Sequence, residues 1–192
     1  MVEHIAAALG LGQSNSGVFP GFAVEDQLDL IQVDRRVIVI DSRNQRQQEF
    51  QLEVGEQILG LDSEGLVAVA RTTARLMGTT TQQQNWQELR YQIDERARPP
   101  QEAFLGDRVA MVVLPNRLVA MSTTTRSWQE FAIGPREPRG RILADTNVVA
   151  ALTARRAIAF APGLSSFAEI NLTPNEAVEG TQTRDSSVTV TT

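Results

Sequence analysis

Arginine and glutamate recur in this sequence at the fixed spacing that a repeated charged site would require. Each of four arginines is followed 13 positions later by a glutamate; the pairs are Arg36 with Glu49, Arg75 with Glu88, Arg117 with Glu130, and Arg156 with Glu169. In a two-strand hairpin, residues with a constant index sum lie opposite each other, so Arg75 and Glu88 are expected to pair across strands. We interpret the pairs as cross-strand ion pairs that set the register, each worth about 0–1 kcal/mol if exposed. The functional alternative is one charged ligand site in every repeat.

Tryptophan occurs at two equivalent positions of this pattern, Trp86 and Trp128, and each begins the string Trp-Gln-Glu. Phe167 occupies the corresponding position before the last glutamate, and Gln47 the one before the first. Structurally, such rings cover the edge of a sheet. Functionally, exposed tryptophans at repeated positions stack on sugar rings or anchor a partner. Packing is the interpretation we favour, and Arg126 in the neighbouring loop favours a binding role for that repeat alone.

Aspartates precede the first strand of several repeats, at Asp26, Asp107 and Asp145. They are expected in turns, where the aspartate side chain accepts hydrogen bonds from nearby backbone; lining a polar tunnel or binding a cation is the alternative. The single histidine, His4, lies close to the N-terminus, so neither a catalytic triad nor a histidine metal site is expected. No loop resembles a phosphate cradle, and the sequence predicts no catalytic residue, cofactor or metal.

A repeat of about 40 residues connects these positions. The four arginines are offset by 39, 42 and 39 residues, and an apolar run begins eight residues before each of them. A fifth run begins at Val188. We therefore divide the single domain, residues 1–192, into repeats at about 25–63, 64–105, 106–144 and 145–184, with a partial fifth repeat at 185–192.

Each repeat is predicted to form four short strands. In the third repeat they are residues 109–114, 117–121 and 128–133, with a short strand around 141–144. The first two strands are apolar at nearly every position, which indicates burial on both faces, and no sustained helical stripe is present. Four antiparallel strands in about 40 residues resemble the β-propeller repeat class. That resemblance implies an all-β propeller, or an arc of one, made of four-stranded antiparallel blades.

The ends of the chain are expected to join in a fifth blade, with residues 21–24 as its outer strand and residues 188–192 as its inner strand. The alternatives are a homo-oligomer, in which a second copy of the chain completes the propeller, and a piece of a longer protein. An unclosed arc would expose apolar sheet faces and unpaired strand edges, so closure or association is predicted.

Charge and composition narrow the classes of partner. With 18 basic and 23 acidic residues the net charge is -5, and the basic residues form no stripe, which argues against nucleic-acid binding. No apolar run reaches the roughly 18 residues that span a bilayer, and the absence of cysteine excludes disulfides and thiolate metal sites. These features predict a soluble chain, either cytoplasmic or exported without disulfides.

Together the patterns favour a non-enzymatic propeller scaffold that presents loops to a protein partner, because the repeats carry no catalytic constellation. A lectin-like propeller is the alternative, binding glycans or small ligands near Trp86, Trp128 and Arg126. A hydrolase that depends on the carboxylates of Asp107 and Asp145 is the second alternative. It ranks last because the repeats differ little from one another.

Overall fold

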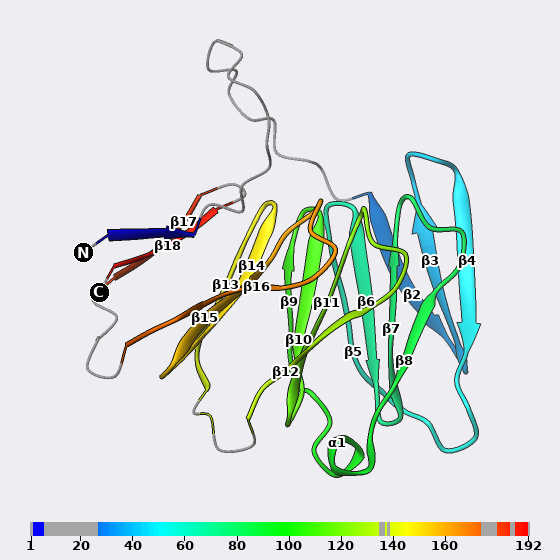
Figure 1. Cartoon of the computed structure of the whole chain (residues 1–192). Coiled ribbons are helices and arrows are strands. Elements are labelled where there is room, and N and C mark those ends of the chain that lie inside the picture. Colours follow the sequence, from blue (N-terminus) through cyan, green and yellow to red (C-terminus); the bar gives the residue numbers. More distant parts are fainter. Residues whose placement is uncertain are drawn as a thin grey trace.

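The computed structural model of the chain describes residues 2–5, 27–134, 137, 139–173, 180–184 and 187–191. Antiparallel strands dominate this part of the chain and one short helix accompanies them, so the protein is all-β (Figure 1). The strands form five sheets that lie side by side in a row. The sequence prediction of an all-β repeat fold is therefore confirmed at the level of the sheets.

Three of the five sheets have four strands, and the sheets at the two ends of the row have three. The first sheet contains β2 (Leu28–Val33), β3 (Arg36–Asp41) and β4 (Arg46–Gln51). The second contains β5 (Ile58–Glu64), β6 (Val67–Thr72), β7 (Arg75–Thr80) and β8 (Gln87–Arg90). The third contains β9 (Ala103–Gly106), β10 (Val109–Val113), β11 (Arg117–Ser122) and β12 (Gln129–Ala132). The fourth contains β13 (Arg139–Asp145), β14 (Val148–Thr153), β15 (Arg156–Phe160) and β16 (Ala168–Asn171). The fifth contains β17 (Gly180–Arg184), β18 (Ser187–Thr191) and β1 (Val2–Ile5).

The sheets are shifted by one strand relative to the sequence repeat. The short strand predicted around residues 141–144 exists as β13, but it pairs with β14 of the following repeat and not with β12. A two-residue turn at 146–147 joins β13 to β14, whereas β12 and β13 are separated by residues 133–138. Because a tight turn places consecutive strands side by side, the last strand of each repeat becomes the first edge of the next sheet.

The two ends of the chain meet in the fifth sheet, where β18 lies between β17 and β1. The strand that the N-terminal region supplies is Val2–Ile5; the predicted outer strand at residues 21–24, and Asp26, lie outside the described residues. β18 starts at Ser187, one residue before the predicted start. Among the described strands the row does not close into a ring, because the first and fifth sheets lie at its opposite ends (Figure 1).

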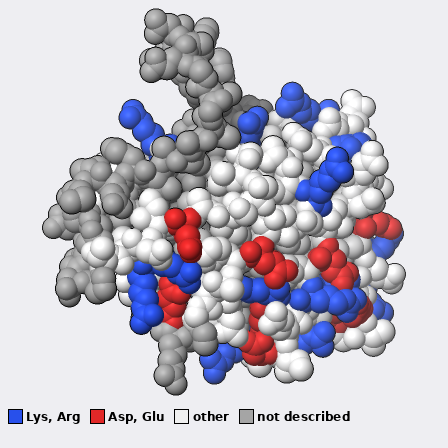
Figure 2. Space-filling view, in the orientation of Figure 1, with Lys and Arg blue, Asp and Glu red and all other residues white. Residues whose placement is uncertain are grey.

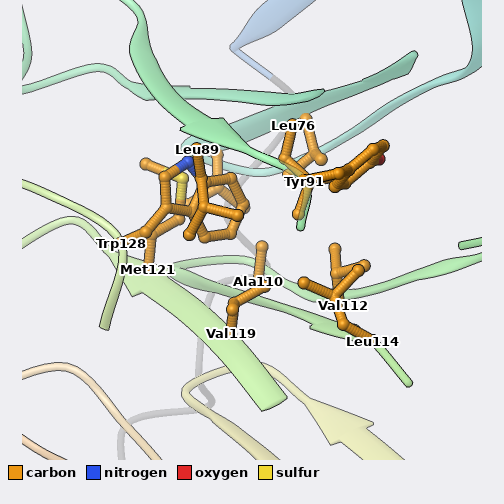
Figure 3. Packing of buried hydrophobic residues seen from close by; sticks show 11 residues of the cluster. Leu76, Leu89, Tyr91, Ala110, Val112, Leu114, Val119, Met121 and Trp128 are labelled. Atoms are coloured by element: carbon orange, nitrogen blue, oxygen red, sulfur yellow. The ribbon is translucent and has the colours of Figure 1, made fainter. Parts of the chain in front are cut away.

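Neighbouring sheets pack face to face through their central strands. Every residue of β6, β7, β11 and β14 is buried, as the apolar runs predicted. Side chains alternate between the two faces, so Val69 and Leu76 pack toward the third sheet while Ala70 and Met77 pack toward the first. Figure 3 shows the cluster between the second and third sheets, where Leu89 lies next to Met121 and the ring of Trp128.

Gly78 allows a close approach between these two sheets. A Cβ atom at this position would lie 2.6 Å from the ring of Trp128 and closer still to the sulfur of Met121. The equivalent residues of the third and fourth repeats are Ala120 and Ala159, so the need for glycine is local. It follows from Met121 and Trp128 of the next sheet, which together take the space that a methyl group would fill.

Replacing Gly78 by alanine is therefore expected to destabilise the fold by about 1–3 kcal/mol, because the added methyl group overpacks the contact with Trp128. Gly180→Ala is the matched control, since none of the described residues lies within 4 Å of a Cβ atom there, and its effect is expected within about 0.5 kcal/mol. Urea unfolding of the two variants measures the difference. Equal free energies of unfolding for the two variants would contradict the close contact described at Gly78.

Candidate functional site

The row of sheets has two ends that carry different residues. One end, here called the turn end, holds the tight turns at 65–66, 107–108 and 146–147. The opposite end, the connector end, holds the segments 52–57 and 91–102 that lead from one sheet to the next. Figure 2 shows acidic and basic side chains interleaved in a band toward the connector end.

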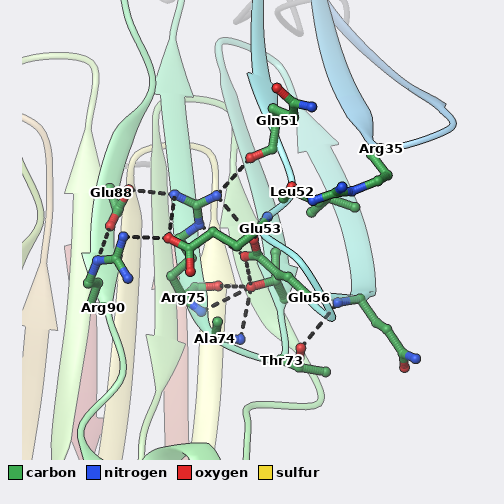
Figure 4. A network of polar contacts seen from close by, with 12 residues as sticks. Arg35, Gln51, Leu52, Glu53, Glu56, Thr73, Ala74, Arg75, Glu88 and Arg90 are labelled. Atoms are coloured by element: carbon green, nitrogen blue, oxygen red, sulfur yellow. Dashed lines mark hydrogen bonds and ion pairs between the residues drawn. The ribbon is translucent and has the colours of Figure 1, made fainter.

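Arg75 is the centre of one polar network at the connector end (Figure 4). Its Nε and Nη2 atoms donate to the two carboxylate oxygens of Glu56 at 3.0 and 3.1 Å, and Nη1 donates to Glu88 at 2.6 Å. The Nη2 atom also donates to the backbone oxygen of Gln51 at 2.9 Å. A planar guanidinium fits a carboxylate through two parallel hydrogen bonds, so Glu56 is held in one orientation.

The same arrangement recurs in the next two repeats. Arg117 donates from Nε and Nη2 to Glu95, both at 2.7 Å, and from Nη1 to Glu130 at 2.5 Å. Arg156 donates from Nε and Nη2 to Glu137, at 3.0 and 2.5 Å, and from Nη1 to Glu169 at 3.0 Å. Each arginine thus binds one glutamate of a neighbouring strand and one glutamate of a connector. Sequence reasoning found the first set of glutamates and missed the second.

The strand glutamates lie diagonally from the arginines, which corrects the predicted register. Arg75 is directly opposite Arg90, and Glu88 is opposite Met77, two residues along the strand. Long side chains span such a diagonal, so the ion pair forms although the two residues are not opposite. Arg36 is the weakest member: within the described residues its carboxylate partner is Glu49, at 3.6 Å, and both side chains are about half exposed.

Ionisation in these networks is fixed by their hydrogen bonds. Burial would by itself raise the pKa of Glu56, but hydrogen bonds from Arg75 and Thr72 hold that pKa below its usual value. A hydrogen bond from Arg156 lowers the pKa of Glu137 to about 2. Both carboxylates are therefore charged and already paired at neutral pH. The geometry favours the structural interpretation of the arginine-glutamate pattern over a ligand site in every repeat.

The two tryptophans lie between sheets. The ring of Trp128 is 8% exposed, and its Nε1 donates to the backbone oxygen of Gln87 at 3.1 Å. Trp86 is half-buried and meets Phe50 edge to face, with the ring centres 5.0 Å apart. Phe167 occupies the same position of its repeat and packs on Phe131 of the preceding sheet, with the ring centres 5.5 Å apart. Each aromatic ring fills the gap toward the preceding sheet, in line with the packing interpretation.

The remaining predicted residues lie at the turn end. Asp107 and Asp145 stand at adjacent hairpin turns, where the Asp145 side chain accepts a hydrogen bond from the backbone of Thr146 at 2.7 Å. These two turns are themselves joined, because the backbone N–H of Arg108 donates to the backbone oxygen of Thr146 at 3.2 Å. Arg126 is exposed in the 123–128 loop. The structure brings the two aspartates to neighbouring turns, where turn chemistry accounts for Asp145.

Helix α1 (Ile93–Ala97) is the element that the sequence prediction missed. It lies in the connector between β8 and β9, where the repeat is three residues longer than its neighbours. The Glu95 carboxylate accepts a hydrogen bond from the backbone of Gln92 at 2.7 Å, which caps the first turn, and it also binds Arg117. The string Gln-Ile-Asp-Glu and the longer spacing were signals for this turn of helix; five residues are too few for a periodic stripe.

A cleft of about 720 Å³ opens beside α1 at the connector end. Ala97, Pro99 and Pro100 line one side, and Val113 and Pro115 line the other. Arg71 fixes the first wall by donating to the backbone oxygens of Pro100 and Gln101. Because Arg71 is buried and also paired with Asp62 at 2.9 Å, this wall is held in place before any ligand arrives.

Comparisons with known proteins give no family for this chain. No protein-family model matches it, and no curated protein matches it. Among solved structures it is similar to a chain in the S. cerevisiae complex of Dbp5 bound to Nup159, Gle1, IP6 and ADP, with 12% identity and a TM-score of 0.39. The match covers 77% of this chain and 43% of that chain, so this chain spans less than half of that chain's length.

The described residues contain no group of three or more histidine, cysteine, aspartate or glutamate side chains arranged to hold a metal ion. The same residues contain no helix that is long and apolar enough to cross a membrane. The cleft beside α1 is the candidate functional site because it is lined by both apolar and charged residues and its first wall is held by Arg71.

Removing a connector-bound arginine is expected to cost far more than removing the first arginine of the pattern. Arg117→Gln leaves the fully buried Glu95 without its cation, for an expected loss of about 3–5 kcal/mol. Arg36→Gln removes an exposed pair and is expected to cost within about 1 kcal/mol. Urea unfolding compares the variants. Similar losses would contradict the structural role assigned to the connector glutamates.

Glu137 is expected to make stability depend on acid pH. Its pKa is about 2 in the fold, below its ordinary value of 4.5, so its contribution is present above 4.5 and is lost as the pH falls toward 2. The difference in unfolding free energy between the wild type and Glu137→Gln should therefore shrink over that range. Denaturant unfolding at successive pH values measures it. A difference that stays constant down to about pH 2.5 would contradict the assignment.

Proposed function

We propose that this chain is a non-enzymatic interaction scaffold that binds an extended segment of a protein partner in the cleft beside α1. The observation that carries the proposal is a coincidence of three features at one place. The single lengthened spacing between repeats, from 75 to 117, contains helix α1, and α1 borders the cleft. A repeat that serves only to stack on its neighbours needs neither a longer connector nor an added helix.

The chemistry of the cleft supports a peptide ligand. Its volume of about 720 Å³ lies in the range of small-ligand and side-chain pockets. Prolines, Ala97 and Val113 provide apolar walls, while Asp94 and Arg98 place one charge of each sign among the lining residues. Apolar walls with a few polar groups are typical of sites that fix an extended segment by alternate side chains.

An exposed aliphatic side chain on α1 supports the same proposal. Ile93, the first residue of the helix, is 90% exposed and directly precedes Asp94, which lines the cleft. Isolated apolar side chains are common on surfaces; this one adds apolar area next to a cleft whose walls are already apolar.

We further propose that the row of sheets is an arc of a β-propeller. Four-stranded antiparallel sheets that succeed one another every 39 to 42 residues, and that bury both faces of their central strands, support this architecture. Glycan binding and carboxylate-dependent hydrolysis remain predictions from the sequence. The burial of Trp128 gives the former little support, because sugar stacking needs an open ring face.

The cleft can be tested with peptides selected from a random displayed library. Ala97→Trp places a large ring in the cleft and is expected to weaken binding of the selected peptides at least about tenfold, or about 1.4 kcal/mol. Val54→Trp introduces the same residue at an exposed site outside the cleft lining and serves as the matched control, with unchanged affinity expected. Fluorescence anisotropy with labelled peptides measures both. A library that yields no binder, or binders indifferent to Ala97→Trp, would contradict the proposal.

A further inference from the structure

The outer face of the first sheet is an apolar surface with no neighbouring sheet among the described strands. The pairing of β2 with β3 places Ile31 directly opposite Ile38. Ile40 and Val33 lie on the same face because side chains two residues apart share a face. Ile31, Val33 and Ile40 are 45%, 40% and 38% exposed. Four aliphatic side chains therefore form a continuous strip across two strands.

This strip occupies the position that every inner sheet buries. Ile38 corresponds in the repeat to Met77, Val119 and Ile158, which are at most 4% exposed. In those repeats the same face packs against the preceding sheet, through β2 with β6, β6 with β10 and β10 with β14. The residue types of a buried interface are thus retained on the outer face of the first sheet. This retention indicates that the face is covered in the assembled protein.

We infer that the surface that covers the strip is not another repeat sheet stacked in front of the first one. The inner sheets fill the gap to their predecessor with an aromatic ring at Trp86, Trp128 or Phe167, and the first sheet has the exposed Gln47 at this position. The opposite end of the row does not match the strip either. Its outer face, on β17 and β18, is lined by polar residues such as Gln182, Ser187 and Thr189. Head-to-tail addition of a second copy would place aliphatic side chains against polar ones.

The charges around the strip make it complementary to itself. Asp29 lies beside Ile40 at one end of the strip, and Arg36 lies beside Val33 at the other end. If two copies of the strip pack face to face with their strands antiparallel, Asp29 of each copy meets Arg36 of the other. Arg36 is also the arginine of the pattern that pairs with one carboxylate within the described residues, whereas Arg75, Arg117 and Arg156 each pair with at least two.

We propose that the outer face of the first sheet binds the same face of a second copy of this chain about a two-fold axis, with the strands antiparallel. The four aliphatic residues of each copy form the centre of the interface. Asp29 of the partner subunit supplies the second carboxylate to Arg36. A two-fold contact uses the same patch on both subunits and closes at two copies, so it does not extend into a filament. The cleft beside α1 lies outside this face, so the inference does not depend on the proposed function.

The test measures the mass of the full chain in solution by light scattering and sedimentation at micromolar concentrations. The expected particle has twice the chain mass of 21.1 kDa. Ile38→Asp, which buries a charge in the centre of the interface, is expected to give a monomer. Thr189→Asp, at the polar end of the row, is the control and should leave the dimer intact. Circular dichroism shows whether each variant keeps its fold.

A charge exchange keeps the proposal testable if Ile38→Asp does not fold. Asp29→Arg and Arg36→Asp each bring like charges together across the two-fold axis, so each is expected to raise the dimer Kd about tenfold or more. The double variant restores opposite charges and should recover most of the affinity. A wild-type monomer, a dimer that tolerates both single exchanges, or an assembly broken by Thr189→Asp would overturn the proposal. A monomer would also be the result if another segment of the same chain covered the strip.

Discussion

Burial of aliphatic sheet faces against one another is the constraint on which the rest of this structure depends. A sheet whose central strands are apolar on both faces needs a neighbour on each side, as β6 and β7 show. Repetition supplies those neighbours in sequence order. The sheets at the two ends of the row lack one neighbour among the described strands, and their outer faces differ. Strands β17 and β18 carry polar residues on the outer face of the fifth sheet, whereas the first sheet keeps the aliphatic strip around Ile31 and Ile38.

The arginine networks fix the position of the sheets along the strands, which apolar stacking alone does not. Apolar packing has no strong directional preference, so sheets need another element to fix their position along the strands. Each guanidinium of Arg75, Arg117 and Arg156 binds a connector glutamate through two hydrogen bonds and a strand glutamate through a third nitrogen. The connector that leads into each sheet is thereby fixed to a strand of that sheet. Buried, fully paired networks of this kind specify one arrangement even where their net contribution to stability is small.

Much of the fold could be predicted because the repeat and the apolar runs are local signals. The spacing of the arginines predicted four similar units, and the apolar runs predicted the buried central strands. The pairing of the last strand of each repeat with the next sheet was harder to predict. It depends on whether the loop before that strand or the loop after it is the tight one, as for β13 with residues 133–138 and 146–147. The diagonal position of Glu88 relative to Arg75 depends on strand register, which a constant index sum leaves open by two residues.

The candidate site was harder to predict because it arises where the repeat is broken. Helix α1 has five residues, Glu95 is separated from Arg117 by 22 positions, and the cleft walls come from two separate segments. Trp86 and Trp128, which the sequence offered as candidates, lie packed between neighbouring sheets, at positions that recur with the repeat.

Native-state hydrogen exchange of the backbone amides tests the stacking of the sheets most directly. Stacked sheets with buried central strands predict the slowest exchange in β6, β10, β11 and β14, and faster exchange in the outer strands β8 and β12 and in helix α1. Slowest exchange in the outer strands, or equal protection in every strand, would contradict the burial of these strands between neighbouring sheets.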